Sequence, residues 1–112
     1  MTNTISLEDF KKVDIAVGEI LAVEKIPETD KLLKLTVNFG ETAPRQIVSG
    51  IALHFPNYEI LTGKKCMFVL NLEPRIIRGV ESQGMILTVS DEVGNFSLLH
   101  PNNEIPVGTR AR

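Results

Sequence analysis

The chain has 112 residues, 43% of them hydrophobic and 23% charged, which is typical of one globular domain with a single core. The formal net charge of −2 argues against a protein that coats nucleic acid through bulk positive charge. The polar, acidic start and the lack of any apolar run near ~20 residues predict neither a secretory leader nor a membrane span. We expect one cytoplasmic domain over residues 1–112, with no membrane partner.

The beginning of the chain predicts a short helix followed by a strand. Residues 6–12 read SLEDFKK, where Ser6 is a good N-cap and acids fill the first turn, so a helix of one or two turns is expected. Residues 13–26 are rich in β-branched side chains and predict a strand. Its apolar alternation slips after Gly18, which predicts a β-bulge or a bend at that glycine.

The middle of the chain predicts two further strands and then an irregular excursion. Residues 32–39 alternate apolar and polar side chains, as in a strand with one buried and one wet face. Residues 45–50 start a third strand. Residues 51–65 contain a few helical positions, a proline and a TGK turn, and they predict a short helix or a loop.

The last part of the chain predicts more short strands. Residues 65–72 and 84–90 are apolar runs suited to a sheet buried on both faces or to the interior of a small barrel. Residues 91–95 predict a turn and residues 96–100 a short final strand. The whole pattern favours an all-β fold, a closed barrel of about five strands with one or two short helices, over a sandwich.

The sequence contains no catalytic or metal-binding pattern. His54 and His100 lie far apart, and no nucleophile elbow, paired-cysteine motif, zinc-protease motif or phosphate loop occurs. Structural zinc needs four ligands in closely spaced pairs, which two isolated histidines and one cysteine do not supply. Cys66 lies inside an apolar run and is predicted to be buried. We expect a binding module with no enzymatic activity, no cofactor and no metal ion.

Positive charge is concentrated in one segment of this acidic chain. Residues 1–30 carry three lysines and seven acids, whereas residues 64–80 carry four cations and one acid. The basic segment includes two arginines, in the stretch NLEPRIIRGVESQGMIL between two apolar runs. From the residues alone, such a pair is most simply a solvated pair on a hairpin.

Several motifs follow one another in the order and spacing of a known domain. They are DFKKVDIAVGEI, DKLLKLTVNFG, IVSGI, LTGKK, VLNLEPRIIRGVESQGMIL and LLHPNNEIPVGT, and they cover nearly the whole chain. With them the chain resembles the tRNA-binding domain of methionyl-tRNA synthetases, which stand-alone dimeric tRNA-binding proteins share and to which an export-chaperone-like branch is related. The Asn-Leu-x-Pro-Arg, Arg-Gly and Ser-x-Gly-Met elements are its most specific part.

The resemblance implies an oligonucleotide-binding fold, or OB-fold, with no catalytic activity of its own. It implies a module that binds folded tRNA through phosphate and shape contacts, with little preference among species. It also implies a homodimer and an aminoacyl-tRNA synthetase partner, most simply the methionyl enzyme. Whether the chain stands alone or is a piece of a synthetase is left open.

The resemblance also assigns candidate RNA-binding residues in the basic segment. Arg75 and Arg78 would contact phosphates, because a guanidinium offers bidentate geometry. Ser82 and Gln83 match the family's Ser-Glu/Gln position and would bond to sugars or base edges. The full predicted set is Lys31, Lys34, Asn71, Arg75, Arg78, Ser82 and Gln83.

The other three members of the set are predicted with alternatives. Lys31 matches the basic position of the family's Asp-Lys-Leu element and would follow the phosphate path. Lys34 lies on the wet face of its strand, where a lysine is by default solvated. Asn71 would present its amide to a base or cap a turn.

Two departures from the family pattern bear on the ligand. Ile76 stands where the family often has a lysine, and Ala16 replaces a common arginine, so two cations are missing and weaker binding is expected. Among the phenylalanines only Phe55 is an easy exposed candidate, so base stacking over a broad surface is not expected. The alternative function is a chaperone-like module that binds a peptide or precursor protein, and it is favoured if Ile76 points to solvent.

Overall fold

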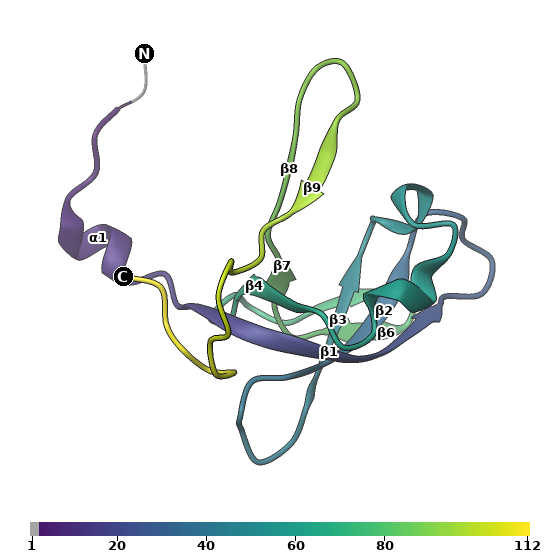
Figure 1. The fold of residues 1–112 in the computed structure, drawn as a ribbon, viewed down its shortest axis with the longest axis horizontal. Coiled ribbons are helices and arrows are strands. Elements are labelled where there is room, and N and C mark those ends of the chain that lie inside the picture. The colour runs from purple at the N-terminus through teal and green to yellow at the C-terminus, as the bar shows by residue number, and fades with distance from the viewer. Residues whose placement is uncertain (1–2) are drawn as a thin grey trace.

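The computed structural model describes residues 3–112, which form a small β-barrel with further short hairpins (Figure 1). The helices are α1 (Leu7–Lys11) and the 3-10 helices η1 (Ala52–His54) and η2 (Tyr58–Leu61). The strands are β1 (Ile15–Lys25), β2 (Leu33–Asn38), β3 (Arg45–Ser49), β4 (Lys65–Val69), β5 (Arg75–Ile77), β6 (Val80–Ser82), β7 (Met85–Ile86), β8 (Thr88–Ser90) and β9 (Phe96–Leu98).

Five antiparallel strands form the barrel sheet in the order β3-β2-β1-β4-β7, which confirms the predicted all-β barrel of the OB type. The long strand β1 lies at its centre, pairing with β4 through its first half and with β2 through its second half. One strand can serve two neighbours in this way because it curves round the barrel, as Figure 1 shows. Eleven residues are long enough for both pairings.

The bulge in β1 lies at Leu21, so the prediction of a bulge at Gly18 is wrong. The register with β2 shifts between Ile20 and Ala22, whereas Gly18 pairs regularly with Cys66 on β4. Gly18 is needed for close packing instead, since a Cβ there would overlap the Phe39 ring.

The barrel interior is apolar and continuous. The predicted alternation over residues 32–39 is confirmed, because Leu33, Leu35 and Val37 are fully buried and face the same core. Cys66 is also fully buried as predicted, and burial raises the pKa of its thiol to about 11. The two 3-10 helices, which confirm the expected irregular excursion, add Leu61 and Ala52 to the core.

Side-chain hydrogen bonds bridge the gap between β3 and the end of β6, where the sheet would otherwise stay open. The Val48 amide donates to Ser82 Oγ at 3.0 Å, and the Gln46 amide donates to Gln83 Oε1 at 2.9 Å. The Gln83 amide returns a bond of 2.8 Å to the Gln46 carbonyl. These contacts nearly close the barrel and hold the segment after β6 against β3.

The apolar run 84–90 is not one buried strand, contrary to the expectation. The run divides after Ile86, where β7 ends, and β8 leaves the barrel to pair with β9 in a hairpin. Figure 1 shows that this hairpin extends away from the barrel, and Val89 on β8 is about half exposed. The predicted turn at 91–95 lies at its tip, where Asp91 Oδ1 accepts from the Asn95 amide at 2.9 Å.

The two ends of the chain differ in how they contact the barrel. The predicted helix is confirmed as α1, with Ser6 Oγ accepting from the Asp9 amide at 3.0 Å, but none of its residues is buried. The C-terminal segment pairs with β1, where the Val17 amide donates to the Thr109 carbonyl at 2.9 Å. None of the helices within residues 3–112 has the length and apolar character needed to cross a membrane.

Candidate nucleic-acid interface

The basic segment forms the predicted hairpin, which we call the arginine hairpin and define as β5, β6 and the turn between them. Arg75 pairs with Ser82, and Ile77 pairs with Val80. The two turn residues, Arg78 and Gly79, both have positive φ, 53° and 78°. Such a left-handed pair matches the twist of a two-residue hairpin and places the arginine at its tip.

Arg75 and Arg78 are exposed cations without acidic partners. Both side chains are solvent-exposed, and none of the ion pairs within residues 3–112 includes either of them. Their guanidinium groups are therefore available for a ligand. Such groups suit phosphate oxygens, which accept two parallel hydrogen bonds from one guanidinium.

The arginine hairpin occupies a loop that OB-folds use for ligands. OB-folds bind oligonucleotides on the face of the second and third strands, between the loop joining strands one and two and the loop joining strands four and five. Here the second of these loops is the connection from β4 to β7, which contains the arginine hairpin. Lys31 lies in the first, between β1 and β2, and its side chain is exposed.

Lys34 lies on the same face of the sheet as the hollow beside Arg75. Lys34 on β2 is directly opposite Val48 on β3, and paired residues of antiparallel strands project from the same face. Val48 in turn lines a small hollow of about 90 Å³ together with Arg75. Lys34 Nζ lies 2.7 Å from Glu24 Oε2, so its charge is already partly balanced.

The polar members of the predicted set hydrogen-bond to the protein's own backbone. Ser82 is buried, and its Oγ both accepts from the Val48 amide and donates to the Gly84 carbonyl at 3.1 Å. Asn71 Oδ1 accepts from the Asp14 amide at 2.8 Å and fixes the chain that enters β1. Ser82 and Asn71, with Gln83 at the barrel closure, position the hairpin, and their RNA contacts stay predictions.

Arg45, which the sequence analysis did not single out, anchors the base of the arginine hairpin. Its Nη1 donates to the Leu70 carbonyl at 2.8 Å and to the Gln83 carbonyl at 3.0 Å, on the two sides of the hairpin. Its Nε and Nη2 bind the two carboxylate oxygens of Glu41 at 2.8 and 2.9 Å. The hydrogen bond from Arg45 holds the pKa of Glu41 below its usual range. No local sequence pattern signals this role, because the contacts span 25 and 38 residues.

The two positions where this chain lacks a family cation differ in exposure. Ile76 is 71% exposed on the arginine hairpin, where it pairs with Glu81 on β6. Ala16 is fully buried inside the barrel, so its side chain does not face a ligand. The missing cation that bears on the interface is therefore the one at position 76.

The rings of the chain are distributed differently from the prediction. Phe55 is half-buried and packs against the core, so it is not the exposed phenylalanine that was expected. His54 stacks on Phe96 with ring centroids 3.8 Å apart, a contact across 42 residues that no local pattern reveals. Within residues 3–112, no three His, Cys, Asp or Glu side chains gather in a way that could hold a metal ion.

Comparison with known proteins agrees with this geometry. Residues 15–110 match the family described as "Putative tRNA binding domain". The chain is 44% identical over 108 residues to a methionine–tRNA ligase of Deinococcus radiodurans and 49% identical over 111 residues to that of Methanospirillum hungatei. These matches cover 96% and 99% of the chain but only 16% of each ligase.

Two solved structures share the fold over their whole length. One is a MetRS related protein from Pyrococcus horikoshii, with a TM-score of 0.90 and 42% identity, covering 99% of this chain and 100% of the other. The second is the chaperone CsaA of Bacillus anthracis, with a TM-score of 0.85 and 30% identity, covering 98% and 100%. The barrel, the basic hairpin and these matches together show that the chain belongs to the tRNA-binding domain family.

Proposed function

We propose that the chain is a non-catalytic module that binds folded tRNA through phosphate and shape contacts. The observation that carries the proposal is the placement of its unpaired cations. Arg75 and Arg78 extend from one ligand-binding loop of the OB-fold, Lys31 lies in the other, and the β2–β3 face lies between them. A phosphate backbone laid across this face meets cations at both edges, and Lys34 lies between them once it exchanges Glu24 for a phosphate.

Binding of this kind is electrostatic and tolerant of sequence. Each phosphate neutralised by a cation releases counterions, so affinity falls as salt rises. Three free cations and one paired lysine make few such contacts, so a single domain binds modestly. Ser82, Gln83 and Asn71 supply rigidity, since their hydrogen bonds fix the base of the arginine hairpin.

The partner that fits a modest tRNA binder is an aminoacyl-tRNA synthetase in the cytoplasm. The ligases that the chain matches are methionine–tRNA ligases, which favours the methionyl enzyme. A module held beside a synthetase raises the effective concentration of tRNA at that enzyme, and affinity then increases without new contacts in the active site.

A homodimer is the proposed assembly, and α1 supports it. This helix has no buried residue, and the apolar side chains of Ile5, Leu7, Phe10 and Val13 are exposed around it. A second copy would cover them and double the number of phosphate contacts. Sedimentation of the wild-type chain should give a dimer, and Leu7→Glu/Phe10→Ser should give a monomer. A monomeric wild-type chain at micromolar concentration would contradict the assembly.

The test of RNA binding is fluorescence anisotropy with labelled bulk tRNA at about 50 and 200 mM salt. The Arg75→Ala/Arg78→Ala variant should bind at least about tenfold more weakly at low salt, with a salt slope reduced by about two. The matched control is Lys11→Ala/Arg112→Ala, which removes two exposed cations from the ends of the chain and should bind like wild type. Lack of binding by the wild-type chain at low salt would overturn the proposal.

A second candidate function is binding of an unfolded protein client, which the exposure of Ile76 favours. Ile76 is 71% exposed in the arginine hairpin, next to Arg75 in the chain, and one structural neighbour is a chaperone. This exposed side chain would contact an apolar stretch of a client chain. If so, the chain should slow the aggregation of a denatured model protein, and Ile76→Ser should remove this effect without changing tRNA binding.

A further inference from the structure

A cavity of about 460 Å³ lies outside the proposed tRNA interface, between η1 and the β8–β9 hairpin. His54 and Phe55 line one side, residues 95–98 line the other, and His100 lies at the edge. Its volume is within the range of about 300–1,000 Å³ that is usual for small-ligand sites. None of the residues in the predicted RNA-binding set contributes to it.

Aromatic and imidazole side chains are few in this chain, and several of them line this cavity. The sequence has no Trp, one Tyr, five Phe and two His, and both histidines and two of the phenylalanines line this one cavity. His54 lies parallel to Phe96 at 3.8 Å with an interplanar angle of 5°, and Phe55 meets Phe96 edge-on at 5.9 Å. Because His54 is exposed, the face of its imidazole turned away from Phe96 can accept another flat ring.

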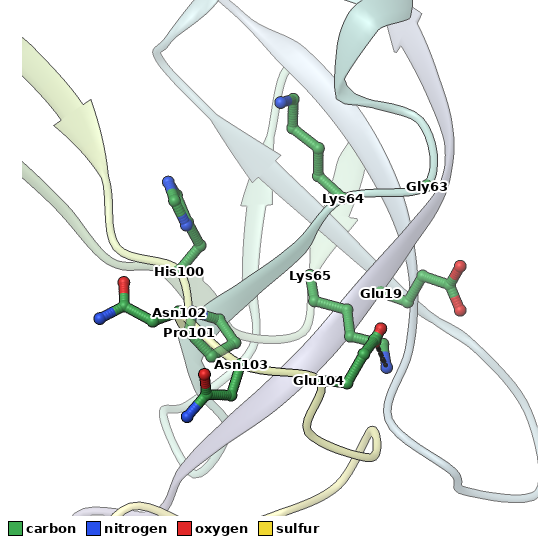
Figure 2. A pocket seen from close by; sticks show the side chains of 9 residues that line it. All are labelled: Glu19, Gly63, Lys64, Lys65, His100, Pro101, Asn102, Asn103 and Glu104. Atoms are coloured by element: carbon green, nitrogen blue, oxygen red, sulfur yellow. Dashed lines mark hydrogen bonds and ion pairs between the residues drawn. The ribbon is translucent and has the colours of Figure 1, made fainter.

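A second cavity, of about 590 Å³, adjoins the first at His100 and adds a cation. Figure 2 shows Lys64 and His100 extending to one side of the chain, while Lys65 and Glu104 lie together on the other. Lys65 Nζ is held by Glu104 at 3.3 Å and by the Ile105 carbonyl at 2.8 Å. Lys64 takes part in none of the ion pairs within residues 3–112, so it is free to bind an anion.

Polar groups without internal partners also line the second cavity. The side chains of Asn102 and Asn103 are exposed, line the second cavity and make no hydrogen bond to other side chains or to the backbone within the described part of the chain. An amide both donates and accepts, so it suits the edge of a base or a ribose hydroxyl. Rings, amides and a free cation therefore lie along one continuous surface.

We propose that these two cavities form one site for an unpaired nucleotide of an RNA. The base stacks on His54 and extends the His54–Phe96 pair, and its phosphate lies between Lys64 and His100. Stacking platforms beside a cation are how proteins hold single-stranded nucleotides. The inference rests on the proposed function only in taking RNA as the ligand. It adds a second contact, built from elements other than the arginine hairpin.

An unpaired nucleotide of tRNA comes from a loop or from the single-stranded 3′ end, and the test separates these sources. The probes are an anticodon stem-loop and an acceptor-stem hairpin, each with 2-aminopurine at one unpaired position. Stacking on a ring quenches this fluorophore, so the probe whose nucleotide enters the site loses fluorescence on addition of the chain. Quenching of either probe supports the site and identifies the source.

Two exposed residues make the test specific. His54→Ala should weaken binding of the quenched probe about tenfold and abolish the quenching, because one stacking contact is lost. Lys64→Ala should keep the quenching at saturation but lower the salt slope by about one. The matched control Lys11→Ala should change neither, and thermal melting checks that each variant is folded.

The outcomes separate the inference from the proposed function. If His54→Ala binds and quenches both probes like wild type, or if neither probe is quenched while bulk tRNA still binds through Arg75 and Arg78, the nucleotide site is overturned. If bulk tRNA does not bind but a probe is quenched in a His54-dependent way, the nucleotide site stands and the proposed function fails. If no RNA binds at all, both are overturned.

Discussion

The arginine hairpin and the β8–β9 hairpin are the same structural element anchored in two different ways. The arginine hairpin is tied to the barrel by hydrogen bonds to Ser82, Gln83 and Arg45 at its base. The β8–β9 hairpin is held at its base by backbone hydrogen bonds to β4, from the Met67 amide to the Leu99 carbonyl at 2.9 Å and from the Leu87 amide to the Met67 carbonyl at 3.0 Å. Farther out, no side-chain hydrogen bond to the barrel is found within residues 3–112, and the hairpin contacts η1 through the stack of Phe96 on His54. Directional hydrogen bonds fix register and orientation, whereas a ring stack tolerates sliding. The first hairpin is therefore built to hold cations in place, and the second to receive a flat ligand.

Substitution of a glycine should give the largest difference in stability between the two hairpins. A Cβ on Gly84, at the base of the arginine hairpin, would lie 2.9 Å from the Val69 carbonyl oxygen, and φ there is 152°. Gly94, in the turn of the other hairpin, has φ 99° but open space around it. We expect Gly84→Ala to lower the free energy of unfolding by about 3 kcal/mol and Gly94→Ala by about 1 kcal/mol. Urea denaturation measures both, and equal losses would contradict the rigid anchoring of the first hairpin.

Substitution of a serine in each hairpin should give the next largest difference in unfolding free energy. Ser82→Ala leaves the buried Val48 amide without an acceptor, which costs about 1–3 kcal/mol of unfolding free energy. Ser97 is exposed and donates only to the Leu98 carbonyl, so Ser97→Ala should cost less than about 0.5 kcal/mol. A Ser82→Ala variant of normal stability that binds tRNA poorly would instead make Ser82 a direct RNA contact.

Adding a cation should strengthen tRNA binding at one hairpin only. Ile76→Lys restores a positive charge next to Arg75, so the salt slope of tRNA binding should rise by about one and affinity at low salt should increase several-fold. Val93→Lys, at the 84%-exposed tip of the other hairpin, is the matched control and should change the slope much less. Anisotropy titrations compare them, and equal gains would mean that bulk charge, and not the arginine hairpin, governs binding.

What the sequence could predict of these hairpins depended on how local the cause was. The turn at the arginine hairpin and its exposed cations follow from adjacent residues, and both were predicted. The structural roles of Ser82 and Asn71 depend on partners 34 and 57 residues away, and the sequence alone does not reveal them. The ring stack is equally non-local, and the division of the apolar run 84–90 depends on the pairing of β8 with β9.

The bulge shows a different reason for failure. A glycine in a strand signals either a bulge or a close approach of another group, and the alternation on both sides of Gly18 does not separate these meanings. The ring of Phe39, which requires the glycine, comes from another strand region, and the bulge itself lies at Leu21, which has no special backbone preference. Local patterns thus predicted the strand but not the position of its irregularity.

The smallest expected effect is a dependence of stability on pH through the anchor of the arginine hairpin. The hydrogen bond from Arg45 lowers the pKa of Glu41 in the folded chain, so the ionised carboxylate stabilises the fold above the ordinary glutamate pKa, about 4.3. That contribution should be lost as pH falls from this value through the lowered folded pKa. Because Glu41 is exposed, Glu41→Gln should cost only a few tenths of a kcal/mol at pH 7.

The pH dependence of the Glu41→Gln effect tests whether the Glu41–Arg45 pair stabilises the arginine hairpin. Urea denaturation of Glu41→Gln and wild type should show a difference in unfolding free energy at pH 7, and this difference should shrink as pH falls below the ordinary glutamate pKa of about 4.3. If the pair also orients the arginine hairpin, Glu41→Gln should bind tRNA more weakly than wild type at pH 7, and this difference should also shrink at low pH, because Arg45 without Glu41 holds the Leu70 and Gln83 carbonyls less firmly.

Asp91, whose pKa is lowered by the side chain and backbone of Asn95, offers the comparison in the other hairpin. Asp91→Asn should leave tRNA binding through Arg75 and Arg78 unchanged, since the network around Asp91 lies within its own turn. A loss of tRNA binding in Asp91→Asn equal to that in Glu41→Gln would show that the two hairpins act on the ligand as one unit.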